Sequence, residues 1–201
     1  MDNTEETLSR YSAEADVGVS FGGLFSALTV FFTGLLISNY NSFSEYVRVP
    51  ILFLVISTFG FVYATLIYAN ATAKLKSTEL KSCEKAIRTA DILSEFMGVY
   101  TLLISIPLVI PVVTDDVFLI YSVFISDVVG LIIYHLSSFD IVQEYYPRAH
   151  FFIVAVIIAL MVALMFFLMN NNQLFLQLSV VATVLFLITI SILCIRKIKS
   201  C

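Results

Sequence analysis

Charged side chains are scarce in this sequence. They make up 13% of its 201 residues, whereas a typical soluble domain has about 25%. Hydrophobic residues make up 60%, which is more than a soluble fold of this length can bury. The net charge of −4 gives no general attraction to nucleic acid. The composition therefore predicts an integral membrane protein whose principal partner is the lipid bilayer.

Proline, glycine and cysteine are also few. No Pro-, Gly- or Ser-rich linker divides the chain, which predicts one compact membrane domain. The sequence has no Gly-rich phosphate loop, no His-Glu-x-x-His zinc motif and no Gly-x-Ser-x-Gly elbow. The spacing of Cys83, Cys194 and Cys201 fits no metal motif, and His135 and His150 cannot supply two bis-histidine haem sites. We therefore expect no metal and no cofactor.

The first sixteen residues lack the basic start of a signal peptide. Their one basic residue is Arg10, and the apolar run that follows is too long for a signal sequence. The acidic residues of this segment are Asp2, Glu5, Glu6, Glu14 and Asp16. We expect no cleaved signal, and we interpret residues 1–16 as an acidic cytoplasmic N-terminal segment.

Long apolar runs are what the sequence does contain. A membrane-spanning helix needs about 20 mostly apolar residues, and six runs qualify. They lie at 17–38, 49–69, 92–113, 117–137, 151–169 and 174–195. The runs are continuously apolar rather than alternating, which favours helices over barrel strands. The predicted fold class is all-α: a polytopic protein with six transmembrane helices in residues 17–195, and with a linker at about 70–90. In a prokaryote its membrane would be the plasma membrane.

Short polar turns and basic residues predict the topology. Thr114-Asp115-Asp116 separates the third and fourth runs, and residues 170–172 are three asparagines between the fifth and sixth. Such turns predict three antiparallel hairpins. Apart from Arg48, the basic residues fall on one side of the runs, and the positive-inside rule then places both chain ends in the cytoplasm, together with a basic tail at 196–201. These residues are Arg10, Lys74, Lys76, Lys81, Lys85, Arg88, Arg148, Arg196, Lys197 and Lys199.

The linker at 70–90 has an apolar stripe. Leu75, Leu80, Cys83 and Ile87 recur at near-helical spacing among lysines and glutamates. Two interpretations follow. The linker either extends the second and third helices into the cytoplasm, or forms a helix that lies on anionic lipid.

The fourth apolar run has an aspartate at its centre. Asp127 costs at least ~2.5–3.5 kcal/mol to insert there, so it must face the protein interior, face water or be protonated. Residues equally far from the tight turn at Asp115 lie at equal depth, which places Tyr100, Thr101 and Ser105 near Asp127. We expect these hydroxyls to donate hydrogen bonds to the carboxyl group.

The same register pairs Glu95 with His135, about one turn inside the cytoplasmic boundary. Asp91 precedes Glu95 by four residues and shares its helix face. Together Asp91, Glu95, His135 and Asp127 form an expected polar track from the cytoplasm to mid-membrane, and Tyr134 shares a face with Asp127. The track predicts a proton or cation pathway. The structural alternative is a buried Asp satisfied by hydroxyls, with a Glu and a His that extend to water.

Small residues follow one face of the first predicted helix. Gly22, Ser26, Thr29 and Thr33 have a 4-3-4 spacing. Small residues let membrane helices approach closely, so we expect a packing face here, although such residues also suit a narrow pore.

Three functions fit these features. The first is a small transporter or channel for a small solute or cation, linked to protons through Asp127. The second is a non-transporting subunit, sensor or scaffold whose basic linker binds a partner or anionic lipid, and whose partner is a second copy or another membrane protein. The third is a membrane enzyme that acts on lipid; we expect it least, because its candidate residues are sparse. Those candidates are Asp91, Glu95, His135, Asp140 and Glu144.

Overall fold

The computed structural model describes residues 2–75, 80–137, 145–170 and 174–200. All regular structure assigned to these residues is helical. The elements are α1 (Asp2–Ser38), η1 (Tyr40–Ser42), η2 (Glu45–Val47), α2 (Arg48–Leu75), α3 (Leu80–Ile92), η3 (Leu93–Tyr100), α4 (Thr101–Val113), α5 (Val117–Leu136), α7 (His150–Met169) and α8 (Leu174–Ser200). Several residues used in the sequence predictions lie outside the described ranges: Lys76, Asp140, Glu144, Asn171, Asn172 and Cys201.

Within the described residues, six helices are long and apolar enough to cross a membrane. This confirms the prediction of a helical chain with six apolar runs of spanning length. The runs are Ser9–Ser38, Glu45–Lys74, Ser82–Val113, Val117–Leu136, His150–Met169 and Leu174–Arg196. The third run consists of α3, η3 and α4 joined end to end.

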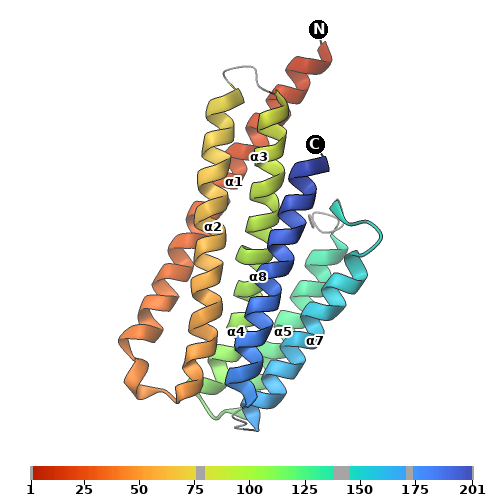
Figure 1. Ribbon diagram of the computed structural model, residues 1–201. Coiled ribbons are helices and arrows are strands. Elements are labelled where there is room, and N and C mark those ends of the chain that lie inside the picture. Colours follow the sequence, from red (N-terminus) through yellow and green to blue (C-terminus); the bar gives the residue numbers. More distant parts are fainter. Residues whose placement is uncertain (1, 76–79, 138–144, 171–173, 201) are drawn as a thin grey trace.

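The helices form an elongated bundle (Figure 1). α1 packs along α2, and α2 packs along the rod made by α3, η3 and α4. α5 and α7 both contact α4, while α8 contacts α3 and α7. Both chain ends lie at the same end of the bundle, and the α1–α2 and α4–α5 connections lie at the other. The α4–α5 connection is the predicted turn, since α4 ends at Val113 and α5 begins at Val117.

Burial along α1 follows a seven-residue repeat. Ala15, Gly22, Thr29 and Leu36 are buried, and this spacing keeps one seam of a helix against its neighbour. The neighbour is α2, where an added Cβ on Gly22 would lie 2.3 Å from Oγ1 of Thr65. Much of the rest of α1 is exposed and apolar, which suits a helix that faces lipid.

The linker extends the second and third spans. α2 continues to Leu75 and α3 begins at Leu80. Cys83 and Ile87 are buried in a cluster with Tyr68 of α2 and Ala15 of α1, and the Cys83 thiol donates to the Ala71 carbonyl at 3.5 Å. The structure thus has the first of the two arrangements over the described residues, and protein covers Cys83 and Ile87 of the apolar stripe.

Candidate functional site

The third span contains a stretch of π-helix. η3 is π-helical, a form in which backbone N–H groups bond to the carbonyl five residues earlier; it widens the helix and is common at functional sites. Side-chain hydroxyls bond to the carbonyls at the end of this stretch. Ser57 of α2 donates to the carbonyl of Gly98 at 2.8 Å, and the hydroxyl of Thr101 donates to the carbonyls of Met97 and Gly98.

Two glycines let α2 hold this stretch. A Cβ added to Gly60 would lie 2.5 Å from the carbonyl carbon of Met97 and 2.6 Å from the backbone nitrogen of Gly98. A Cβ added to Gly98 would lie 2.6 Å from the ring of Phe61. The two backbones therefore meet where side chains have no room, and this contact fixes η3 against α2.

Asp91 lies in the last turn of α3, two residues before η3, and is 5% exposed. Its Oδ1 accepts a 2.6 Å hydrogen bond from the hydroxyl of Tyr68 on α2. Its Oδ2 accepts a hydrogen bond from the hydroxyl of Tyr145, in the segment that leads into α7. A carboxyl that accepts on both oxygens has the bonding pattern of an ionised carboxylate.

Glu95 lies in the first turn of η3 and is 2% exposed. Its Oε2 accepts a 2.8 Å hydrogen bond from the hydroxyl of Tyr134 on α5. The two carboxyl groups are four residues apart in the third span. Tyrosines from α2, from α5 and from the segment before α7 therefore converge on them.

A histidine pair lies next to this cluster along α5. His135 is 3% exposed, and its Nε2 lies 3.0 Å from Nδ1 of His150 at the start of α7. One ring must donate and the other accept in such a contact. The predicted partner of Glu95 was His135, but the hydrogen bond shown comes from the adjacent Tyr134, while His135 joins α5 to α7.

The segment before α7 contacts a cation of α3 and adds a second tyrosine. The guanidinium of Arg88 lies 5.9 Å from the centre of the Tyr145 ring and is paired with Glu84 at 2.5 Å. The hydroxyl of Tyr146 is buried with no hydrogen-bond partner among the described residues. Burial raises the pKa of Tyr146, so this hydroxyl stays neutral.

Asp127 has a carboxyl oxygen that two of the predicted hydroxyls do not bind. Its Oδ2 is buried and has no hydrogen-bond partner among the described residues. The Ser105 hydroxyl donates to the carbonyl of Leu102 at 2.7 Å, Thr101 bonds its own helix as described above, and Tyr100 is buried with its ring edge-on to Phe96. Thr101 and Ser105 therefore donate to backbone carbonyls three or four residues back rather than to Asp127.

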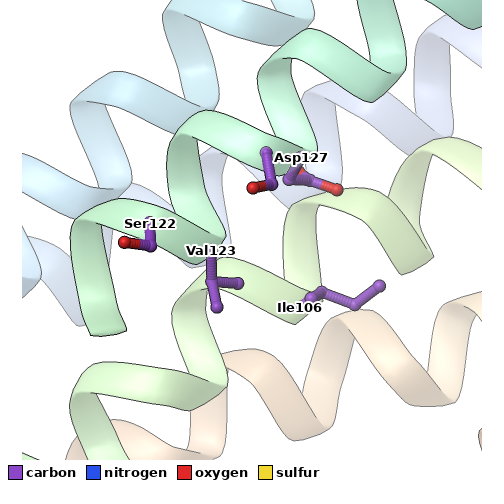
Figure 2. A pocket seen from close by; sticks show the side chains of 5 residues that line it. Ile106, Ser122, Val123 and Asp127 are labelled. Atoms are coloured by element: carbon purple, nitrogen blue, oxygen red, sulfur yellow. The ribbon is translucent and has the colours of Figure 1, made fainter. Parts of the chain in front are cut away.

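Asp127 instead lines two cavities that share Ser126. One has a volume of about 370 Å³ and includes Ile106 of α4 (Figure 2). The other has a volume of about 380 Å³ and reaches Tyr134. Tyr134 thus lines the same cavity as Asp127 and donates a hydrogen bond to Glu95. Through Tyr134, the predicted residues Asp127, Glu95 and Asp91 lie near one another in the bundle.

Of the small residues of α1, some contact α2 and others bond to carbonyls of α1 itself. Gly22 and Thr29 face α2, where the hydroxyl of Thr58 donates to Oγ1 of Thr29 at 2.9 Å. The hydroxyl of Ser26 donates to the carbonyl of Gly23 at an exposed position. Thr33 likewise bonds the carbonyl of Thr29 at 2.6 Å. The contacts of Gly22 and Thr29 are of the kind that close helix packing uses, whereas Ser26 and Thr33 bond carbonyls of their own helix.

Three site residues were not among the predicted ones, and a fourth, Tyr134, was predicted only to share a helix face with Asp127. Tyr68, Tyr134 and Tyr145 donate to the carboxyl groups, and His150 pairs with His135. Tyr134 had a usable signal, since it lies at nearly the same distance from the α4–α5 turn as Glu95. Tyr68 and Tyr145 had none, because no short turn fixes their register against Asp91.

Comparisons with known proteins add no assignment. No family model matches the chain, and neither a curated protein nor a solved structure is significantly similar to it.

Proposed function

We propose that this chain is a small membrane transporter that moves a small solute or cation in a proton-linked manner. The observation that carries the proposal is the pair Asp91 and Glu95, two buried carboxyl groups beside and within a π-helical stretch of a membrane span. Acidic side chains in membrane spans are costly and commonly belong to ion or proton pathways. Their hydrogen bonds reach three other elements of the bundle, so their charge is linked to helix packing.

Protonation would change these contacts directly. An ionised carboxyl group accepts hydrogen bonds on both oxygens, whereas a protonated one also donates. A proton on Glu95 therefore alters the bond that joins α5 to the third span, and a proton on Asp91 alters the bonds from Tyr68 and Tyr145. The π-helical stretch provides a place where the third span can change its turn geometry in response.

In this proposal Asp127 is the mid-membrane end of the proton or solute pathway that leads to Glu95 and Asp91. It lies near the middle of α5 and shares a cavity with Tyr134. Tyr134 in turn contacts Glu95, and Asp91 follows one helical turn away. We propose that a solute or proton bound at Asp127 is sensed by the buried pair through Tyr134.

The proposed topology places both chain ends in the cytoplasm and arranges the six spans as three antiparallel hairpins. Support comes from the distribution of basic residues, of which Arg48 alone falls on the opposite side. The location of both chain ends at one end of the bundle is consistent with it (Figure 1). In this orientation Asp91 and Glu95 lie in the cytoplasmic half of the membrane.

The test is uptake into proteoliposomes that contain the purified chain. A panel of inorganic cations, organic cations, amino acids and anions is offered with and without an imposed pH gradient. We expect saturable uptake of one class that the gradient drives and that a protonophore abolishes. Uptake equal to that of protein-free vesicles for every compound would contradict the proposal.

A non-transporting subunit is the second candidate, and the exposed apolar surface of α1 favours it. Val17, Leu24 and Phe31 are each at least 60% exposed, which leaves room for a membrane partner or a second copy. The basic linker, with Lys85 and Arg88 on α3, would add a site for a partner or anionic lipid. Absence of uptake together with a stable hetero-complex or homo-oligomer in native membranes would favour this function.

A further inference from the structure

The groove beside Asp127 has walls from four parts of the bundle. Phe21 and Phe25 of α1 and Phe61 of α2 form one wall, and Asp127 and Tyr134 of α5 form the other. Val99 and Leu103 of the third span lie between the two walls. The neighbouring cavity shares Ser126 and Asp127 with this groove and is also lined by Ile106 of α4 (Figure 2). Apart from the Asp127 carboxyl group and a few hydroxyls, the side chains that line the two cavities are apolar.

The three phenylalanine rings form a compact group. The ring centres of Phe21 and Phe25 are 4.4 Å apart, those of Phe25 and Phe61 are 5.4 Å apart, and those of Phe21 and Phe61 are 6.0 Å apart. Phe61 is held in place by its close contact with Gly98. Phe61 is fully buried and supports the partly exposed rings of Phe21 and Phe25, which form an aromatic surface opposite α5.

The opposite wall carries a carboxyl oxygen that lacks a partner. Oδ2 of Asp127 is buried without a hydrogen-bond partner among the described residues. A Cβ added to Gly130, one turn further along α5, would meet no atom within 4 Å, so the space next to the carboxyl group is open. A buried anionic or polar group of this kind is stabilised when a ligand supplies the missing charge or donor.

We infer that this groove binds an organic cation with apolar or aromatic substituents. A carboxylate neutralises its charge, and aromatic rings attract it through their π faces while burying its apolar groups. Inorganic cations fit poorly, because Mg²⁺ and Ca²⁺ take several oxygen ligands and the described residues hold no group of three or more His, Cys, Asp or Glu side chains. A neutral lipid chain fits the apolar walls but leaves Asp127 unmatched.

The position of the groove also suits such a ligand. Phe21 and Ile106 at its edges are 40% and 39% exposed and lie within apolar spans, so an amphiphilic cation dissolved in the membrane can enter sideways. Tyr134 at the far end links the ligand to Glu95. If the transport proposed above is correct, an organic cation is its substrate. Binding of the cation to the groove can be measured whether or not the chain transports it.

The experiment measures equilibrium binding of radiolabelled tetraphenylphosphonium to the chain in lipid nanodiscs, with empty nanodiscs subtracted. Tetraphenylborate, which has the same shape and the opposite charge, serves as competitor. We expect saturable binding that unlabelled tetraphenylphosphonium displaces and tetraphenylborate does not. Asp127→Asn should weaken the affinity about tenfold or more, because it removes the neutralising charge.

Matched variants keep the test informative. Asp115→Asn removes an exposed carboxyl group in the α4–α5 turn and should leave affinity unchanged. Phe25→Leu should weaken binding about threefold to thirtyfold through loss of a ring, whereas Phe31→Leu, on the exposed face of α1, should not. Folding of each variant is checked by its elution profile, and the phenylalanine pair remains decisive if Asp127→Asn fails to fold.

Three outcomes would overturn the inference: no saturable binding, equal displacement by tetraphenylborate, or equal affinity of the groove variants and their controls. Each is distinguishable from failure of the transport proposal. Proton-linked uptake of another solute without binding of the cation would refute the inference alone, and binding without any uptake would refute transport alone.

Discussion

The hydroxyl of Tyr134 donates a 2.8 Å hydrogen bond to Oε2 of Glu95. This contact joins α5 to the π-helical part of the third span, whose last helix, α4, is connected to α5 by residues 114–116. Tyr134 also lines the groove that contains Asp127. The tyrosine is therefore the residue through which the open groove and the buried carboxyl pair can influence each other.

Tyr134→Phe should lower both stability and coupling. The change removes the hydroxyl donor of Oε2 of Glu95 and should reduce the free energy of unfolding by about 1–3 kcal/mol. Tyr121→Phe is the matched control, because Tyr121 lies on the same helix and is 50% exposed. Unfolding of both variants in detergent, followed by circular dichroism, makes the comparison. Equal stability of the two variants would show that the hydrogen bond contributes nothing.

Gly60→Ala should destabilise the contact between α2 and the π-helical stretch. The added methyl group would lie 2.5 Å from a backbone atom of Met97, so the helices must separate, at a cost of about 1–3 kcal/mol. Gly34→Ala is the control, since its added methyl group meets no atom within 4 Å, and alanine favours a helix. A thermal midpoint of Gly60→Ala at or above that of Gly34→Ala would contradict the close approach.

The depth at which residues of α5 meet residues of the third span was predictable from the sequence. The rotation of α5 about its own axis was not. A three-residue turn between α4 and α5 forces residues at equal distance from it to equal depth, and Glu95 does meet α5 within one residue of the expected His135. Successive residues of a helix point about 100° apart, so an error of one position selects Tyr134 instead. No sequence signal indicated which face α5 turns toward the third span.

The π-helical stretch and the residues that contact it could not be predicted from the sequence either. The apolar run at 92–113 has the composition of an ordinary spanning helix, and the widened turn depends on contacts from Ser57 and Gly60 of α2. Tyr68 and Tyr145 reach Asp91 from segments whose register no tight turn fixes. The six apolar helices, by contrast, follow from length and composition alone.

Asp127→Leu should leave stability unchanged or raise it. The hydroxyls of Thr101 and Ser105 donate to backbone carbonyls, so an apolar replacement at position 127 strands neither donor and removes a costly polar group. Asp127→Asn should also fold normally but lose solute uptake. Thermal unfolding and proteoliposome uptake of both variants test this. A loss of more than about 1 kcal/mol in Asp127→Leu would indicate a structural role for the carboxyl group.

Reporter fusions should establish the orientation. We expect fusions that end at Ser42 or Asp116 to report the outside of the membrane and a fusion at the C-terminus to report the cytoplasm, because the basic residues gather on the side of the chain ends. An alkaline phosphatase and green fluorescent protein pair at each position gives complementary signals. An external C-terminus would refute the six-span topology.

Glu95→Gln tests proton-linked transport most directly. Glutamine keeps the shape of the side chain and can still accept from Tyr134, but it cannot bind or release a proton. The measurement is solute uptake by proteoliposomes as a function of the imposed pH gradient, for the wild type and for Glu95→Gln at matched protein content and matched thermal stability. We predict gradient-driven uptake in the wild type and uptake independent of the gradient, or none, in the variant. Full gradient dependence in Glu95→Gln would contradict a role for the buried carboxyl group in coupling.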